Sequence, residues 1–256
     1  MKSGVNKRGQ VTIFIIVAIV VVGLGILFYF LYPKMFSSTG FDVKNPENFL
    51  QNCIEKELKQ TVDLISLQGG EINPTNYYLY QDEKLNYLCY TNEYYKLCSV
   101  QTPFLQKSIE EQLSKNMSTK SKECWSLLIE KYQDKGYSVS SKPGTIKAEI
   151  LPGKVVLRLL DYEISVKKDA SETYNSFNIV LDNNLYELLG IATNIIEWEA
   201  TFGEADMWSY MMFFKYLKAE KLKQTDETKL YILTNKNTGE KFQFASRSLA
   251  FPAGFT

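Results

Sequence analysis

The sequence contains no histidine. Histidine is the commonest general base near neutral pH and the commonest protein ligand for metal ions, so its absence removes every His-dependent triad and most metal sites. The chain also lacks the glycine-rich loop that cradles phosphate groups in nucleotide-binding proteins. The sequence therefore predicts no cofactor and weighs against an enzyme.

Neither sign of charge predominates, because 29 Lys and Arg residues balance 29 Asp and Glu residues. The chain has no basic field that would hold nucleic-acid phosphates and no acidic tail for a basic partner. Nucleic acid is therefore not a predicted ligand. A chain of 256 residues suits a membrane segment plus one sizeable globular domain, with two small domains as the alternative.

One long run without charge lies near the N-terminus. Residues 11–32 read VTIFIIVAIVVVGLGILFYFLY, and a helix of this length crosses a hydrocarbon layer of roughly 30 Å. A secretory signal peptide has a shorter apolar region, of roughly 7 to 15 residues, followed by a small-residue cleavage site. We therefore expect a retained transmembrane helix in membrane lipid; removal of the segment, or its burial as a core helix, is the alternative.

Basic residues flank this run mainly on one side. Lys2, Lys7 and Arg8 precede it, whereas only Lys34 follows closely, so the positive-inside bias places the N-terminus in the cytoplasm. The predicted organisation is a basic cytoplasmic leader (1–10), a transmembrane helix (11–32), a hinge (33–44) and an extracytoplasmic domain (45–256). The expected location is the cell membrane, in a single pass, with the C-terminal domain outside the cell.

The outer domain is predicted to be α+β, with antiparallel sheet and packed helices. Asn45 and Pro46 supply a cap and a first-turn proline for a helix that ends at Gly69. Residues 77–99 are predicted to form two or three short strands. Residues 104–135 have helical periodicity, as one long helix or as two.

In the second half of the chain, apolar and polar side chains first alternate with a period of two. Residues 146–150 and 160–167 alternate apolar and polar side chains around a Pro-Gly turn, which predicts a hairpin, and 177–181 add a third strand. A final hairpin is predicted to pair 230–234 with 241–245.

Two helices are predicted between these sheets. Asn184 and Glu187 have the spacing of a capping box for the first. The second, from Glu204 to Lys221, is apolar on most sides and is therefore expected to be well buried. Four acids lie near their junction, which is typical of a solvated helix end and lacks the ligand spacing of a calcium or magnesium site: Glu197, Glu199, Glu204 and Asp206.

The four cysteines include no CxxC pair and fit two disulfides better than a zinc site. Cys89 and Cys98 flank a turn, which favours local pairing, and Cys53 and Cys124 then remain, each on a predicted helix. Closing a loop of about 70 residues stabilises a fold by on the order of 4 kcal/mol in the chain-entropy model. Reduced, buried thiols are the alternative.

Tyrosines are dense between residues 77 and 95. Exposed tyrosines give large contact area at low entropic cost, so these are candidates for a surface that binds protein or glycan; the alternative is that half of them pack the sheet onto the helices. The candidates are Tyr77, Tyr78, Tyr80, Tyr87, Tyr90, Tyr94 and Tyr95. Asn116 begins a single glycosylation sequon, Asn-Met-Ser.

The string KRGQVTIF at residues 7–14 resembles the class III signal peptide of archaeal type IV pilin-like proteins. The resemblance implies that a prepilin peptidase cuts between Gly9 and Gln10, that the apolar helix is retained, and that such helices pack as a filament core. Thr12 stands where a serine is usual. Phe14 departs from the family, which has a glutamate there that pairs with the new amino group of a neighbouring subunit; the departure disfavours filament assembly more than processing.

The outer domain also resembles a group of membrane-anchored proteins from small-genome archaea, a resemblance that implies no activity. The matched features include the four cysteines, the LQGG helix end at residues 67–70 and the YLCY string at 87–90. The expected function is a non-catalytic surface protein, pilin-like or adhesive, whose partners are other copies or other surface proteins. An accessory or scaffold subunit of an envelope complex is the alternative. A surface hydrolase is a third reading, which a deep pocket with two facing carboxylates would favour.

Overall fold

The computed structural model describes residues 17, 20–22 and 41–252. The chain forms two compact units, Met1–Asp42 and Val43–Thr256. The predicted leader, the Gly9–Gln10 cleavage site, Phe14 and most of the predicted transmembrane and hinge segments lie outside the described residues, and only Val17 and residues 20–22 of the apolar run are described, as helix. Within the described ranges, no helix is both long enough and apolar enough to span a membrane.

Two antiparallel helices form the centre of the second unit, α2 (Pro46–Leu67) and α3 (Leu105–Asp134). The predicted cap of α2 is confirmed, since Asn45 Oδ1 accepts from the Asn48 amide at 3.2 Å, and α3 is one continuous helix. Tyr132 near the end of α3 donates to the Val43 carbonyl at 2.7 Å. Gln112 near its start donates to the Gly70 carbonyl at 2.8 Å, so the helices are joined at both ends.

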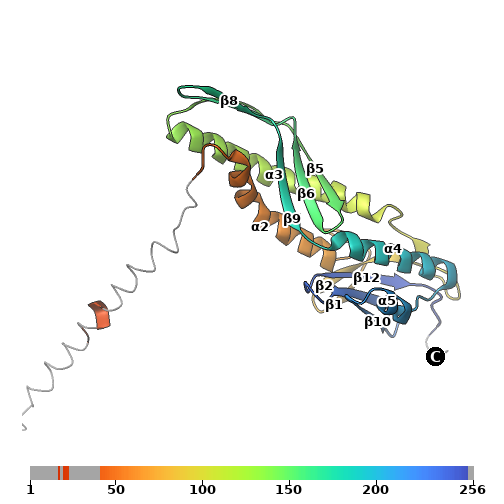
Figure 1. Ribbon diagram of the computed structural model, residues 1–256. Helices are drawn as coiled ribbons and strands as arrows, with labels where there is room; N and C mark the ends of the chain where they lie inside the picture. The colour runs from red at the N-terminus through yellow and green to blue at the C-terminus, as the bar shows by residue number, and fades with distance from the viewer. Residues whose placement is uncertain (1–16, 18–19, 23–40, 253–256) are drawn as a thin grey trace, which may run out of the picture. The chain divides into compact units, whose positions relative to one another are not determined.

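A three-stranded antiparallel sheet covers these helices: β5 (Thr145–Leu151), β6 (Lys154–Leu160) and β9 (Phe177–Asp182), in the order β5-β6-β9 (Figure 1). Helix side chains bond the free edges of the sheet, because edge strands have amides without a strand partner. Glu110 of α3 accepts from the Ile150 amide at 2.9 Å, and Gln51 of α2 accepts from the Val180 amide at 2.9 Å. The predicted third strand, 177–181, is thus confirmed.

The predicted hairpin is correct in its turn but wrong in its second strand. Residues 154–160 pair with β5, whereas β7 (Glu163–Lys167) lies between β4 (Ser138–Lys142) and β8 (Ser171–Tyr174) in a separate sheet. Asp161 has a φ of 60°, which breaks the strand. A Cβ on Gly144 would lie 1.9 Å from the Leu160 carbonyl oxygen, so only glycine admits this close crossing.

The third sheet contains six strands, ordered β1-β2-β12-β11-β10 with β3 paired to β2. Their bounds are Tyr77–Tyr80 (β1), Glu83–Tyr90 (β2), Ser99–Val100 (β3), Leu217–Lys223 (β10), Lys229–Asn235 (β11) and Lys241–Arg247 (β12). The final hairpin has the predicted register, with Leu230 opposite Ala245. The strands expected between 77 and 99 are also confirmed.

Two helices complete the domain, α4 (Leu185–Phe202) and α5 (Met207–Phe213). The predicted capping box is wrong, because Glu187 accepts from the Gly153 amide at 3.1 Å and Asn183 accepts from the Leu185 amide at 2.9 Å. The predicted helix from Glu204 to Lys221 is correct only for the residues of α5, because Leu217–Lys223 form β10. All seven residues of β10 pair with β11, and this pairing outweighs the local helical pattern.

Candidate functional site

The seven candidate tyrosines differ in how deeply they are buried. Tyr87 is buried in a cluster with Leu85, Leu230 and Ala245. Its hydroxyl lies 2.8 Å from Thr228 Oγ1, and burial raises its pKa to about 12. Tyr78, Tyr80 and Tyr90 are half-buried against the same cluster. These four tyrosines pack the sheet, as the alternative interpretation expected.

The other three tyrosines are exposed but lie on different segments. Tyr77 is on β1, with the Lys84 ammonium 5.0 Å from its ring centre. Tyr94 and Tyr95 lie in the loop between β2 and β3, and Tyr95 packs edge to face on Phe251 with ring centres 5.3 Å apart. The seven tyrosines therefore do not form one surface.

Both predicted disulfides are present. Cys53–Cys124 joins α2 to α3 across 71 residues of sequence, and Cys89–Cys98 closes the loop between β2 and β3. Asn116 is exposed in the middle of α3, and its side-chain oxygen accepts from Thr61 Oγ1 at 3.3 Å. Glycosylation there stays a prediction.

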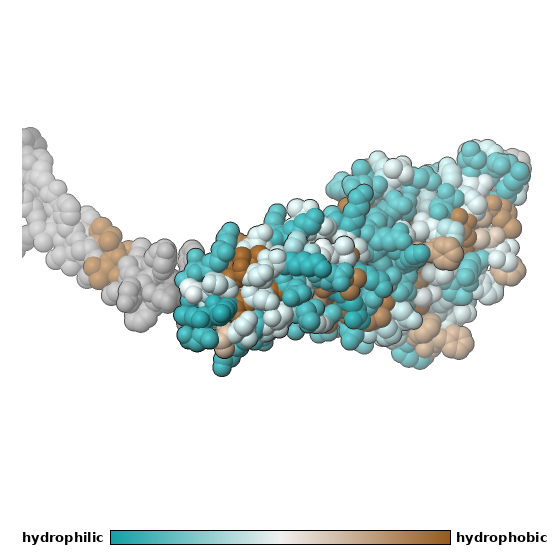
Figure 2. All heavy atoms as spheres, turned by 90° about the horizontal axis from the view of Figure 1, so that it is seen from above, coloured by the Kyte–Doolittle hydropathy of each residue, from teal (hydrophilic) through white to brown (hydrophobic). Residues whose placement is uncertain are grey.

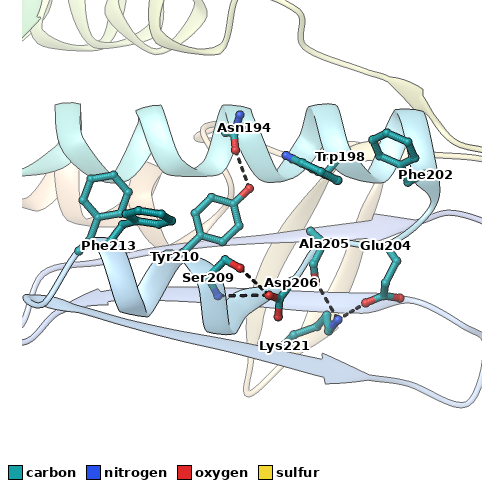
Figure 3. Close-up of a pocket in the computed structure, with 11 residues that line it drawn as sticks. Asn194, Trp198, Phe202, Glu204, Ala205, Asp206, Ser209, Tyr210, Phe213 and Lys221 are labelled. Carbon is teal, nitrogen blue, oxygen red and sulfur yellow. Dashed lines mark hydrogen bonds and ion pairs between the residues drawn. The ribbon is translucent and has the colours of Figure 1, made fainter.

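A cleft of about 860 Å³ lies between α4, α5 and β10 (Figure 3). Five aromatic side chains line it: Trp198, Phe202, Tyr210, Phe213 and Phe214. Its polar lining comes from Asn194, Glu204, Asp206, Ser209 and Lys221. Figure 2 shows apolar side chains at the surface at this end of the domain. We call this hollow the aromatic cleft.

The helix α5 lies at the surface, contrary to the prediction that this segment is well buried. Met207 is its only buried residue, whereas Trp208 is 69% exposed and Phe213 is 79% exposed. Asp206 caps the helix by accepting from the Trp208 and Ser209 amides at 3.1 and 3.3 Å. Because the adjoining strand β10 occupies the sheet edge, α5 has little core left to cover, and its apolar side chains face solvent.

Polar contacts hold the walls of the cleft in place. Tyr210 of α5 donates to Asn194 of α4 at 2.6 Å, and Lys221 of β10 pairs with Glu204 and donates to the Ala205 carbonyl at 2.9 Å. Figure 3 shows these bonds crossing between the elements. They fix α5 beside α4 although its hydrophobic contacts with the core are few.

Both carboxylates of the cleft have lowered pKa values. Burial opposes ionisation of Glu204, but the hydrogen bond from Lys221 and the ammonium of Lys229 outweigh it, so the pKa lies below 4.5. The pKa of Asp206 lies below 3.8, chiefly because Ser209 Oγ and the Trp208 amide donate to it. Both groups are therefore ionised at neutral pH.

A buried polar network lies behind the cleft, centred on Glu199 of α4, which has no exposed surface. Lys229 of β11 donates to both Glu199 carboxylate oxygens, at 3.1 and 3.0 Å, and Ser246 of β12 donates to one of them at 3.0 Å. Tyr231 also donates to Glu199. The prediction of a solvated acidic helix end thus fits Glu197, which is exposed, but is wrong for Glu199.

The network also determines where α4 ends. Lys229 donates to the Gly203 carbonyl and lies 3.2 Å from Glu204, so it joins the network to the rim of the cleft. Gly203 ends α4 with a φ of 75°, a conformation that strongly favours glycine. The chain turns there and carries Asp206 to the start of α5.

Sequence reasoning missed the aromatic cleft. The signal was present as aromatic residues at helical spacing on either side of the α4–α5 junction, but the same pattern is typical of a buried helix. Among the described residues, no group of acidic or cysteine side chains could hold a metal ion. No protein-family model, curated protein or solved structure matches the chain.

Proposed function

We propose that this chain is a membrane-anchored cell-surface protein whose disulfide-bonded domain binds another protein through the aromatic cleft, without catalysis. The observation that carries the proposal is the cleft itself, an open hollow lined by five aromatic rings. Large exposed apolar patches on soluble domains mark interaction sites, and aromatic residues are enriched at the centres of protein interfaces.

The charges of the cleft favour binding over hydrolysis. A carboxylate pair that cleaves glycosides needs one acid with a raised pKa, so that it carries a proton at neutral pH. Glu204 and Asp206 both have lowered pKa values and are already bonded to Lys221 and to the α5 amides. Neither carboxyl is suited to donate a proton.

The location rests on two features of the chain. The apolar run 11–32 is long enough to span a bilayer, and disulfides form and persist mainly in oxidising compartments. The pilin-like string adds a prepilin peptidase as a processing partner at Gly9–Gln10. The second candidate function is an accessory or scaffold subunit of an envelope complex, which Phe14 favours because that position lacks the filament-forming carboxylate.

Variants with one added cysteine test the location, because all four native cysteines are in disulfides and do not react. Ser176→Cys, exposed in the loop between β8 and β9, should react with an impermeant maleimide on intact cells. Ser3→Cys, in chains that still carry the leader before Gly9–Gln10, should react only after permeabilisation. Labelling of Ser3→Cys alone on intact cells would reverse the orientation.

A protection experiment tests the binding role. Phe202→Cys places a thiol at the rim of the cleft, where Phe202 is exposed. It should react fast with the maleimide in purified, detergent-solubilised chain and slowly on intact cells, while Ser176→Cys reacts at the same rate in both. Equal rates for Phe202→Cys would show that nothing covers the cleft in the cell.

A further inference from the structure

The helix α5 carries apolar side chains on two opposite faces. Ser209, Tyr210 and Phe213 line the aromatic cleft together with the cap residue Asp206. A second, smaller hollow lies beside Trp208, Met211, Met212 and Lys215. With 3.6 residues per turn, the helical residues of each set fall on one side of the helix, and the two sides point about 180° apart. Lys215 follows the end of α5 but lines the same hollow as the second set. We call the second set the outer face of α5.

The two faces carry opposite charge. The cleft contains Glu204 and Asp206, both with lowered pKa values, against the single cation Lys221. The outer face contains the exposed Lys215. In the part of the chain that the structure describes, neither Asp206 nor Lys215 has an ion-pair partner within 4.0 Å. One face is therefore apolar and acidic, and the other is apolar and basic.

We propose that the protein bound in the aromatic cleft is a second copy of this chain, which inserts the outer face of its own α5. Trp208, Met211 and Met212 of one copy pack among the aromatic rings of the next, and Lys215 lies near the acidic rim. This inference rests on the proposed function, because it names the partner of the same cleft. Complementary charge at the rim of an apolar contact steers association and fixes its register.

The position of the faces determines the kind of assembly. Because they point in opposite directions, one copy cannot use both against the same neighbour in a two-fold dimer. The contact is head-to-tail, and such contacts build chains or closed rings. Confinement of every copy to one membrane raises the effective concentration, so a modest contact between domains is sufficient.

Mixed cysteine cross-linking of the full chain in membranes tests the contact. Met212→Cys marks the outer face and Phe202→Cys marks the cleft, each with a different tag, and both residues are more than half exposed. When the two variants are co-expressed and oxidised, the mixed dimer should exceed either same-variant dimer several-fold. A chain with both substitutions should give a ladder of dimers, trimers and larger species.

Charge reversal separates a specific contact from random collision. Lys215→Glu places like charges together and should lower the mixed dimer several-fold. The matched control Lys107→Glu reverses an exposed charge on α3 that does not line the cleft, and should change nothing. If Phe202→Cys disturbs folding, Phe213→Cys supplies a second cleft position.

Equal yields of mixed and same-variant dimers, or no dimers at all, would overturn the head-to-tail contact. If dimers are absent but Phe202→Cys is still protected on intact cells, a different molecule fills the cleft, and the proposed binding function survives. If dimers are absent and Phe202→Cys reacts freely on intact cells, the proposed function fails as well.

Discussion

The domain contains two apolar regions that differ in what covers them. Around α3, Trp125 is 3% exposed and packs edge to face against Tyr162 and Phe177 at 4.8 and 5.3 Å. Around α5, Trp208 is 69% exposed. Both segments are rich in apolar side chains, but only α3 has a disulfide partner helix and a sheet across its apolar side. The difference teaches that apolar content predicts contact, and it is the reason why we propose a second molecule as the contact of α5.

The largest loss of stability is expected when the disulfide between α2 and α3 is removed. Replacing Cys53 and Cys124 by alanine should lower the free energy of unfolding by about 4 kcal/mol in the chain-entropy model, because their loop is long. Replacing Cys89 and Cys98, which are 9 residues apart, should cost about 3 kcal/mol. Denaturant unfolding of both double variants measures the difference. A larger loss from the short loop would contradict the entropic account.

The next largest loss of stability is expected in the buried network behind the aromatic cleft. Glu199→Gln removes the buried carboxylate that Lys229 bonds and leaves its ammonium paired with the more exposed Glu204. We expect a loss of about 3 kcal/mol, because breaking a buried ion pair is costly. Glu197→Gln is the matched control on the same helix. Since Glu197 is exposed, its loss should stay below about 0.5 kcal/mol. Equal effects of the two substitutions would mean that Glu199 is solvated.

Substituting one methionine in each region compares the two regions directly. Met117 on α3 has no exposed surface, whereas Met212 on α5 is 55% exposed. Met117→Ala should cost about 2 to 3 kcal/mol, because it leaves a cavity in a packed core. Met212→Ala should cost less than about 0.5 kcal/mol in the monomer. Thermal unfolding measures both, and a large loss for Met212→Ala in the monomer would show that α5 is part of the core.

The smallest expected effect is the pH dependence of the stability of α5. The pKa of Asp206 is lowered in the folded chain from 3.8, so its stabilising contribution is present above pH 3.8 and disappears as the pH falls through the lower folded value. The loss should appear as a local change at α5, seen in Trp208 fluorescence before global unfolding. Asp206→Asn keeps a capping side chain without the charge, so this early change should vanish in that variant. Its persistence would assign it to another group.

The parts that sequence predicted have strong local signals. Asn45 and Pro46 fix the start of α2, and the short turn between β11 and β12 fixes their register. The loop between Cys89 and Cys98 is short, which leaves Cys53 for Cys124. The residues that determine the helix start and the hairpin are close in sequence. For the disulfides, only four cysteines are present, so one pairing leaves a single possibility for the other.

The parts that sequence did not predict depend on distant contacts. Residues 154–160 and 163–167 both alternate, so periodicity could not show which strand pairs with β5. The segment from Glu204 to Lys221 has the pattern of a buried helix, but β11 pairs with its last five residues, from Leu217 onward. Glu199 resembles its exposed neighbours in sequence, and it is distinguished by distant partners such as Lys229, 30 residues later.

The most direct test of the central claim, that α5 is exposed in one copy and covered in an assembly, is acrylamide quenching of single-tryptophan chains in membranes. One chain retains Trp208 and the other retains Trp125, with the remaining tryptophans changed to phenylalanine. We predict strong quenching of Trp208 and weak quenching of Trp125 at low protein-to-lipid ratio. As the ratio rises, the quenching of Trp208 should fall toward that of Trp125. If Trp208 is as shielded as Trp125 at every dilution, or equally quenched at every density, the account is wrong.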